Sequence, residues 1–196
     1  MLVIAGSFRF DARAMTLPKL TLAAALVFFF GCSGAGPYGH SPRYAPLGEE
    51  ETAVSGAREY DPVMYQRQVE EWRKTPTFLF GVVTRRAPGK GGGTYLTLTV
   101  RRLEARNLCE NGNDDDSCRV TVSDRDFGVV HALVALRTED DVGQHSVGAA
   151  SLLRIVGKFG EEVDPNDGGP VLRATYYRHW PRQFFVTKQS AREMLQ

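Results

Sequence analysis

The chain has 196 residues, of which 42% are hydrophobic, and its formal net charge is +1. This length suits one domain with additional segments, and the hydrophobic content excludes a chain that is disordered throughout. A net charge close to zero argues against a dedicated DNA-binding protein, and three cysteines are too few for a zinc module or a disulfide-rich scaffold.

Residues 1–31 have the organisation of a secretory signal peptide. Lys19 supplies positive charge, residues 20–30 form an apolar run, and small residues follow. An apolar run of about 7–15 residues is typical of a cleaved signal, whereas a transmembrane helix needs about 20. Residues 1–14 fit this organisation poorly, so we expect translation to start at Met15.

The end of this signal peptide resembles the lipobox of bacterial lipoproteins. The sequence Phe-Phe-Gly-Cys ends at Cys32, and its glycine matches the lipobox, whereas Phe29 stands where that family usually has leucine. The resemblance implies that Cys32 is acylated after cleavage. Because Ser33 follows it rather than aspartate, the resemblance also implies an outer-membrane lipoprotein whose domain faces the periplasm, with surface exposure as the alternative. A plain cleaved signal followed by an unmodified cysteine is the other interpretation.

Two segments precede the expected domain. Residues 32–60 are rich in Gly, Pro, Ser, Glu and Ala without periodicity, so we expect a flexible, disordered tether. Residues 61–75 are expected to form one amphipathic helix, because Asp61 and Pro62 are typical of a helix start. Apolar residues then recur on one helical face: Tyr65, Val69 and Trp72. Trp72 could be a ligand platform, but packing onto the domain is the favoured interpretation.

From residue 76 onward the hydrophobic period changes to two, which is typical of β-strands. We expect strands at residues 78–83, 95–101, 119–123, 127–136, 151–159 and 170–180. The apolar segment 127–136 would also suit a helix, but its β-branched residues favour a strand. The pattern predicts a mainly β domain over residues 76–196, with about five strands closing a small barrel.

Residues 152–159 and 169–177, with the turn between them, resemble the closing strands of an OB-fold. In this comparison, Gly157 would let its strand coil sharply. The order of signal peptide, lipid cysteine, short helix and β-barrel also resembles that of Slp-type outer-membrane lipoproteins. Together, the resemblances imply an OB-like closed barrel preceded by one helix and a tether.

Cys109 and Cys118 flank an acidic segment, residues 110–117. In an oxidising periplasm we expect these two cysteines to form a structural disulfide. A redox-active pair is the alternative, although such pairs favour a Cys-x-x-Cys spacing. The acidic segment lacks the glycine and glutamate of an EF-hand, so it is interpreted as a solvated loop, and residues 164–169 are interpreted as a turn.

No other motif in the sequence indicates catalysis or metal binding. The four histidines lack a metal-binding spacing, there is no G-x-S-x-G elbow, and no carboxylate pair is singled out. The glycine-rich run 86–93 precedes a strand rather than a helix, so it indicates a hairpin tip and not a phosphate loop. We therefore expect no enzymatic activity, no metal and no cofactor.

The alternation of residues 170–180 predicts an exposed sheet face that could bind a ligand. Arg173, Tyr177 and His179 would share this face, and Tyr95 and Arg101 of the second strand could join them. Cations beside aromatic rings are how OB surfaces bind oligonucleotides and oligosaccharides. In the alternative, the aromatic residues close the barrel and the arginines are solvated.

The sequence thus predicts a lipid-anchored envelope protein with a non-catalytic binding or structural module. Its expected partners are the membrane, through the lipid anchor, and an envelope protein or glycan. Nucleic-acid binding through the OB face is a second hypothesis, which export from the cytoplasm would exclude. Hydrolysis of an envelope polymer is a third, and it would require a carboxylate with a perturbed pKa.

Overall fold

The computed structural model describes residues 37–195. The predicted signal peptide, the expected start at Met15 and the lipid attachment expected at Cys32 lie outside the described residues. Within the described part of the chain, no helix is both long enough and apolar enough to cross a membrane.

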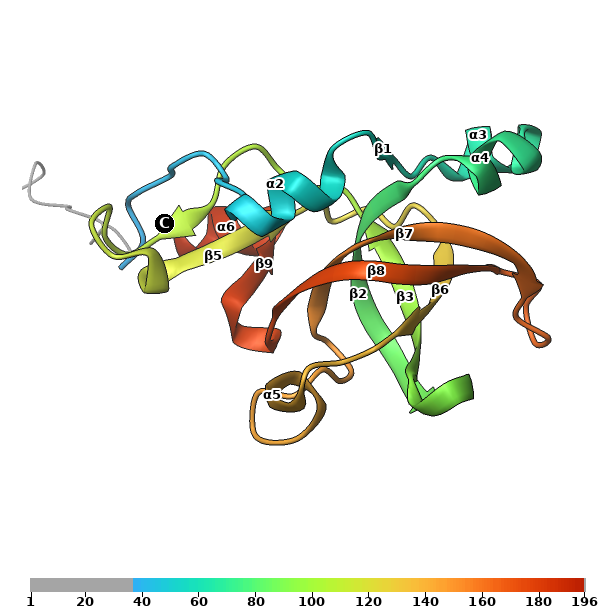
Figure 1. Cartoon of the computed structure of the whole chain (residues 1–196). Coiled ribbons are helices and arrows are strands. Elements are labelled where there is room, and N and C mark those ends of the chain that lie inside the picture. Colours follow the sequence, from blue (N-terminus) through green and yellow to red (C-terminus); the bar gives the residue numbers. More distant parts are fainter. Residues whose placement is uncertain (1–36, 196) are drawn as a thin grey trace, which may run out of the picture. The chain divides into compact units, whose positions relative to one another are not determined.

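The described chain is mainly β, as predicted (Figure 1). Its strands are β1 (Arg58–Glu59), β2 (Thr77–Pro88), β3 (Thr94–Arg101), β4 (Leu108–Cys109), β5 (Cys118–Val122), β6 (Val129–Val134), β7 (Leu152–Val163), β8 (Pro170–Trp180) and β9 (Phe185–Thr187). Its α-helices are α2 (Gly48–Val54), α3 (Pro62–Arg67), α4 (Val69–Lys74), α5 (Thr138–Asp141) and α6 (Lys188–Met194). Short 3-10 turns are η2 (Lys90–Gly92), η3 (Asp115–Ser117) and η4 (Arg182–Phe184).

Five strands form a closed ring of hydrogen-bonded neighbours. Their order is β2-β3-β6-β8-β7, and β7 pairs back onto β2. β6 and β8 run parallel, whereas the other neighbours in the ring run antiparallel. The strand expected within residues 127–136 is confirmed as β6.

The ring encloses a core of aliphatic side chains. β3 alternates strictly, with Leu96, Leu98 and Val100 buried and the residues between them partly exposed. The neighbouring strands contribute further buried residues to the same cluster: Leu79, Val83, Val130, Leu153 and Ile155. Burying one such side chain contributes about 1.5–3 kcal/mol to the free energy of folding, so this core is the main source of stability for the closed ring.

β7 and β8 approach each other closely at Gly157. A Cβ atom at this position would lie 2.2 Å from the carbonyl oxygen of Arg173 and 2.7 Å from the side chain of Leu172. Any other residue would therefore push the two strands apart, so the close approach of β8 requires glycine here. The sharp coiling expected at Gly157 stays a prediction.

β8 contains a β-bulge at Thr175. Ala174 and Tyr176 pair with consecutive residues of β7, which leaves Thr175 as an extra residue between them. A bulge reverses the alternation of the side chains beyond it. Tyr177, which an uninterrupted strand would place on the exposed face, therefore lies in the core with 8% of its surface exposed.

Residues 37–60 are folded against the ring, in contrast to the expected flexible tether. They contain α2 and β1, and Glu50 within them is fully buried. The Glu50 carboxylate accepts hydrogen bonds from Arg154 of β7 and from Arg178 of β8, the latter at 2.8 Å. This buried carboxylate docks the segment together with the pairing of β1 with β2, and neither composition nor periodicity reveals the carboxylate contact.

Residues 61–75 form two short helices instead of the expected one. Asp61 caps α3 as expected, because its Oδ1 accepts hydrogen bonds of 2.9 and 3.0 Å from backbone amides of the first turn. Gln68, with φ −140° and ψ 48°, leaves the helical conformation and separates α3 from α4. The apolar spacing still places one face of both helices on the ring.

Trp72 packs this helical segment onto the domain, which confirms the favoured interpretation. Its ring meets those of Tyr60 and Tyr65 edge-on, at centroid distances of 6.0 and 6.4 Å. The guanidinium of Arg58 lies 3.8 Å above the ring centroid. With 3% of Trp72 exposed, the side chain offers no platform for a ligand.

β5, the strand expected at residues 119–123, lies outside the ring in a second, smaller sheet. It pairs antiparallel with β4 and parallel with β9. Cys109 and Cys118 are cross-strand partners in this sheet and form the predicted disulfide.

We expect the double variant Cys109→Ser/Cys118→Ser to lose about 2–3 kcal/mol of unfolding free energy, because the bridge closes a loop of about ten residues in the unfolded chain. Urea unfolding of the oxidised protein, the reduced protein and the variant measures this loss. The reduced protein should match the variant, and equal stability of all three would contradict the prediction.

Candidate functional site

A pocket of about 490 Å³ lies between the β2–β3 hairpin and the β7–β8 hairpin. Arg85, Ala87 and Lys90 line it from the first hairpin, and Glu162, Val163 and Asp164 line it from the second. Figure 1 shows both hairpins projecting from the ring, far along the chain from each other. The pocket is therefore a product of ring closure.

The pocket opens on the outer face of the ring. Tyr95 of β3 pairs with Ala87 of β2 on one side and with Leu133 of β6 on the other. Cross-strand partners point to the same side of a sheet, and this side is opposite the buried Leu96. All three paired residues line the pocket.

A β-bulge at Thr84 places Arg85 in the pocket. Val83 pairs with the core residue Leu98, and the next pair joins Arg85 to Thr97, so Thr84 is an extra residue. Beyond the bulge the alternation reverses, and Arg85 joins the outer face instead of following Val83 inward.

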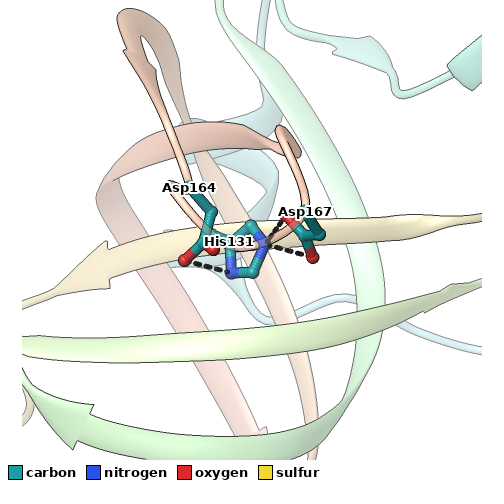
Figure 2. A group of neighbouring side chains, drawn as sticks. All are labelled: His131, Asp164 and Asp167. Atoms are coloured by element: carbon teal, nitrogen blue, oxygen red, sulfur yellow. Dashed lines mark hydrogen bonds and ion pairs between the residues drawn. The ribbon is translucent and has the colours of Figure 1, made fainter.

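His131 of β6 anchors the β7–β8 loop (Figure 2). Its Nε2 lies 3.0 Å from both carboxylate oxygens of Asp167, and its Nδ1 lies 3.6 Å from Oδ2 of Asp164. Only 2% of the His131 side chain is exposed, because the loop covers it. The loop wall of the pocket is thereby attached to the sheet.

Tyr95 holds the same loop from β3. Its hydroxyl donates a hydrogen bond of 2.8 Å to Asp164, and its ring stacks on His131 at a centroid distance of 5.5 Å. The Tyr95 bond, followed by hydrogen bonds from Asn166, lowers the pKa of Asp164 to about 2, so this carboxylate is ionised at neutral pH. Burial and the bond to Asp164 raise the pKa of Tyr95, which keeps its hydroxyl protonated as a donor.

His131, Asp164 and Asp167 are residue types that bind metals, but their arrangement does not fit a metal ion. Their potential ligand atoms lie within 4.8 Å of one another. The two carboxylates, however, lie at opposite nitrogens of the imidazole, as Figure 2 shows, whereas metal ligands converge on one point. Asp164 already accepts hydrogen bonds from Tyr95 and Asn166. The group fits a clamp on the loop.

A second polar cluster surrounds Asp140 of α5. The Tyr177 hydroxyl donates to its Oδ2 at 2.7 Å, and the Arg137 side chain donates to the same oxygen at 2.9 Å. His179 Nδ1 lies 2.7 Å from Oδ1, and its Nε2 lies 3.1 Å from the hydroxyl of Ser151.

His179 links Ser151 to Asp140 through its two ring nitrogens. A serine-hydrolase triad has the same arrangement, in which a histidine links a serine to a carboxylate. Ser151, however, is only 4% exposed, and its hydroxyl also accepts a hydrogen bond of 3.2 Å from the Gly148 amide. A substrate carbonyl has no route to this hydroxyl in the described conformation. The cluster instead connects Ser151, which directly precedes β7, with β8 and with the segment that contains α5.

The Asp140 cluster makes stability depend on pH through His179. Burial lowers the pKa of His179, although Asp140 opposes this shift, and Arg137 and His145 contribute further lowering. Below about pH 6.5 the unfolded chain therefore binds the proton more readily than the folded protein, so unfolding free energy falls as pH falls.

Between about pH 7 and about pH 5.5, we expect the unfolding free energy of His179→Gln to fall less than that of the wild type, because glutamine does not titrate. Urea unfolding at the two pH values measures it. His40→Gln, which changes an exposed histidine outside the Asp140 cluster, is the control and should retain the wild-type pH dependence. If the unfolding free energy of the wild type and of His179→Gln changed equally with pH, His179 would not be the source of this pH dependence.

The residues predicted to form one binding face do not lie together. Tyr95 lines the pocket, whereas Tyr177 and His179 belong to the buried Asp140 cluster. Two features separate them. β6 lies between β3 and β8 in the ring, and the bulge at Thr175 turns Tyr177 inward.

Arg101 and Arg173 occupy two further environments. Arg101, at the opposite end of β3 from Tyr95, forms an ion pair with Asp126. Arg173 is exposed on β8 and forms an ion pair of 3.0 Å with Glu162, a residue of the pocket wall.

Sequence reasoning missed Arg85 and His131 and recognised Asp164 only as part of a turn. The turn itself is confirmed, because the amides of Asn166 and Gly169 bond to the carboxylates of Asp164 and Asp167. The available signal was a single histidine in the apolar segment that forms β6, and nothing in its spacing relates it to the distant aspartates.

Comparison of the sequence with models of known protein families, and with curated proteins, finds no match.

Proposed function

We propose that the chain is a lipid-anchored protein of the bacterial outer membrane, and that its OB-like β-barrel is a non-catalytic binding module in the periplasm. The closed ring of five strands supports the OB-like assignment. An OB-fold is a five-stranded Greek-key barrel, and its binding region lies on the second and third strands and the loops 1–2 and 4–5.

The position of the pocket is the observation that carries this proposal. β3 and β6 are the second and third strands of the ring in chain order, and Tyr95 and Leu133 belong to them. The hairpins that line the pocket join the first strand to the second and the fourth strand to the fifth. The pocket therefore occupies the region that OB barrels use for ligands.

The disulfide supports an exported protein. Cys109 and Cys118 are bonded in the structure, and structural disulfides persist in oxidising compartments such as the periplasm. The lipobox-like sequence ending at Cys32 adds the anchor. One acyl chain holds a protein only marginally at a membrane, whereas several chains on one cysteine hold it stably.

The partner we propose is an envelope protein or a glycan component. A catalytic role is not supported, because Ser151 is buried and the described carboxylates of the pocket are engaged in hydrogen bonds and ion pairs. Export separates the protein from cytoplasmic nucleic acid.

The intact mass of the protein from the envelope fraction tests the anchor and the compartment. We expect a chain that begins at Cys32, carries acyl groups and gains two hydrogens on reduction. A mass that retains residues 15–31, with free thiols, would refute the export part of the proposal.

Photo-crosslinking in intact cells tests the binding region. A photoreactive residue at Val163, on the pocket wall, should give a discrete cross-linked envelope component. The same residue at Val142, which is similarly exposed but away from the pocket, is the control. Identical products at both positions would contradict a specific site.

A further inference from the structure

We infer that the pocket binds an amphiphilic anion, with an apolar body between the two hairpins and one acidic group at Arg85. This inference rests on the proposed role of the pocket as the binding region of the barrel. It adds the chemical class of the ligand, which neither the ring topology nor the disulfide indicates.

The lining of the pocket selects an apolar body. β2, β6 and β8 contribute Ala87, Leu133 and Val171, and the ends of β2 and β7 and the loop after β7 contribute Pro88, Val163 and Pro165. Val163 is an exposed large hydrophobic residue, so its side chain is available to cover a ligand. Binding sites for small molecules are mostly apolar with a few placed polar groups, and this lining has that composition.

Arg85 is the group that selects an anion. Among the described residues, it is the one charged side chain of the pocket lining that makes no ion pair or hydrogen bond. The bulge at Thr84 directs it to the outer face, where it lies on the same side of the sheet as Tyr95. An arginine can bind a carboxylate or sulfonate through two parallel hydrogen bonds.

The acidic residues of the pocket do not cancel this cation. Glu162 is paired with Lys90 at 3.7 Å and with Arg173 at 3.0 Å. Asp164 accepts the Tyr95 hydroxyl and lies beside His131. Each carboxylate therefore has its own donors, and Arg85 remains for the ligand.

Other ligand classes fit the pocket less well. An oligonucleotide needs a row of cations along its backbone, whereas this pocket offers one free arginine. A sugar needs an open aromatic face and several free hydrogen-bonding groups, but Tyr95 is already stacked on His131 and its hydroxyl is engaged. Of the partners proposed above, a glycan therefore fits this pocket less well than a component that carries an amphiphilic acidic group.

A matched pair of fluorescent probes tests the inference. 1-Anilinonaphthalene-8-sulfonate (the anionic probe) and N-phenyl-1-naphthylamine (the neutral probe) share an apolar body and differ in the sulfonate. Four forms of the full folded chain are titrated with each probe: wild type, Arg85→Gln, Ala87→Trp and Arg67→Gln. Ala87→Trp fills the pocket, and Arg67→Gln removes the same charge from an exposed site on α3 outside it.

We expect the wild type to bind the anionic probe. Arg85→Gln should bind this probe at least about fivefold more weakly, because it loses one charge-assisted hydrogen-bonding contact with the sulfonate. Binding of the neutral probe should be unchanged in Arg85→Gln, and Ala87→Trp should abolish binding of both probes. Arg67→Gln should resemble the wild type. Decanoate should displace the anionic probe more strongly than decanol does, and this preference should disappear in Arg85→Gln.

The possible failures are distinguishable. If Ala87→Trp binds neither probe while Arg85→Gln binds both with wild-type affinity, the pocket remains a binding site but its ligand is not selected as an anion. If neither probe binds, or if Ala87→Trp changes nothing, both the inference and the pocket as binding region are refuted. Circular dichroism of each variant confirms that the comparison concerns folded protein.

Discussion

The variant Glu50→Ala is expected to lose about 3–5 kcal/mol of unfolding free energy, the cost of removing one partner from a buried ion pair. Glu50 is fully buried, and its carboxylate accepts hydrogen bonds from the side chains of Arg154, Arg178 and Tyr44. The Arg154 and Arg178 side chains are themselves only 9% and 24% exposed. Alanine would therefore leave two poorly solvated cations without their counter-charge.

Urea unfolding measures the loss, and Glu49→Ala is the matched control. Glu49 precedes Glu50 in the same helix but is exposed, so its replacement should change stability by less than about 0.5 kcal/mol. The triple variant Glu50→Leu/Arg154→Met/Arg178→Met should recover most of the loss, because it removes all of the buried charges together. A loss below about 1 kcal/mol for Glu50→Ala would show that residues 37–60 are not docked through this carboxylate.

The same carboxylate should contribute to acid unfolding. Burial alone raises the pKa of Glu50, but the hydrogen bonds from Arg154, Tyr44 and Arg178 together outweigh burial and lower it below the usual value. The stabilisation is therefore complete above about pH 4.5 and is lost as the pH falls toward the folded-state pKa. Glu50→Ala should lack this part of the acid dependence.

The second large effect is expected for Asp140→Ala, which should cost about 3 kcal/mol. Asp140 is buried and accepts hydrogen bonds from Tyr177, Arg137 and His179. Truncation leaves the buried donors of Tyr177 and His179 unsatisfied between β8 and α5, whereas the half-exposed Arg137 side chain stays solvated. The loss should also loosen the segment after α5, where the Val147 amide bonds to the Asp140 carbonyl.

Thermal unfolding and amide hydrogen exchange measure this effect. Glu139→Ala, at the exposed neighbouring position, is the control and should be close to neutral. Tyr177→Phe removes one donor and keeps the ring, so it should cost about 1–2 kcal/mol, clearly less than Asp140→Ala. Equal effects of Asp140→Ala and Glu139→Ala would refute the assigned network.

Much of the fold was predictable from local patterns. Alternation placed the strands of the ring, and β-branched residues identified β6 correctly as a strand. Asp61 was recognisable as a helix cap, and the expectation of an oxidising compartment, together with two cysteines near each other in the chain, predicted their disulfide. These features depend on neighbours in the sequence or on a short loop, which is why a single sequence carries them.

The predicted binding face was not reproduced because one-residue irregularities are not visible in an alternating pattern. A bulge at Thr175 moves Tyr177 into the core, and a bulge at Thr84 moves Arg85 onto the outer face. Each bulge inverts the side-chain alternation beyond it, so a correct strand assignment still gives the wrong face.

The sequence by itself determined the mainly β character, the positions of the ring strands and the cap of α3, because short-range periodicity and capping chemistry encode these features. It also indicated the disulfide, because the two cysteines lie close together in the chain. The tertiary structure alone decided that residues 37–60 dock through Glu50, that His131 clamps the β7–β8 loop and that Arg85 lines the pocket. Each of these depends on ring closure, which joins residues far apart in the chain, and on bulges and buried ion pairs whose energetics arise only after the strands have met.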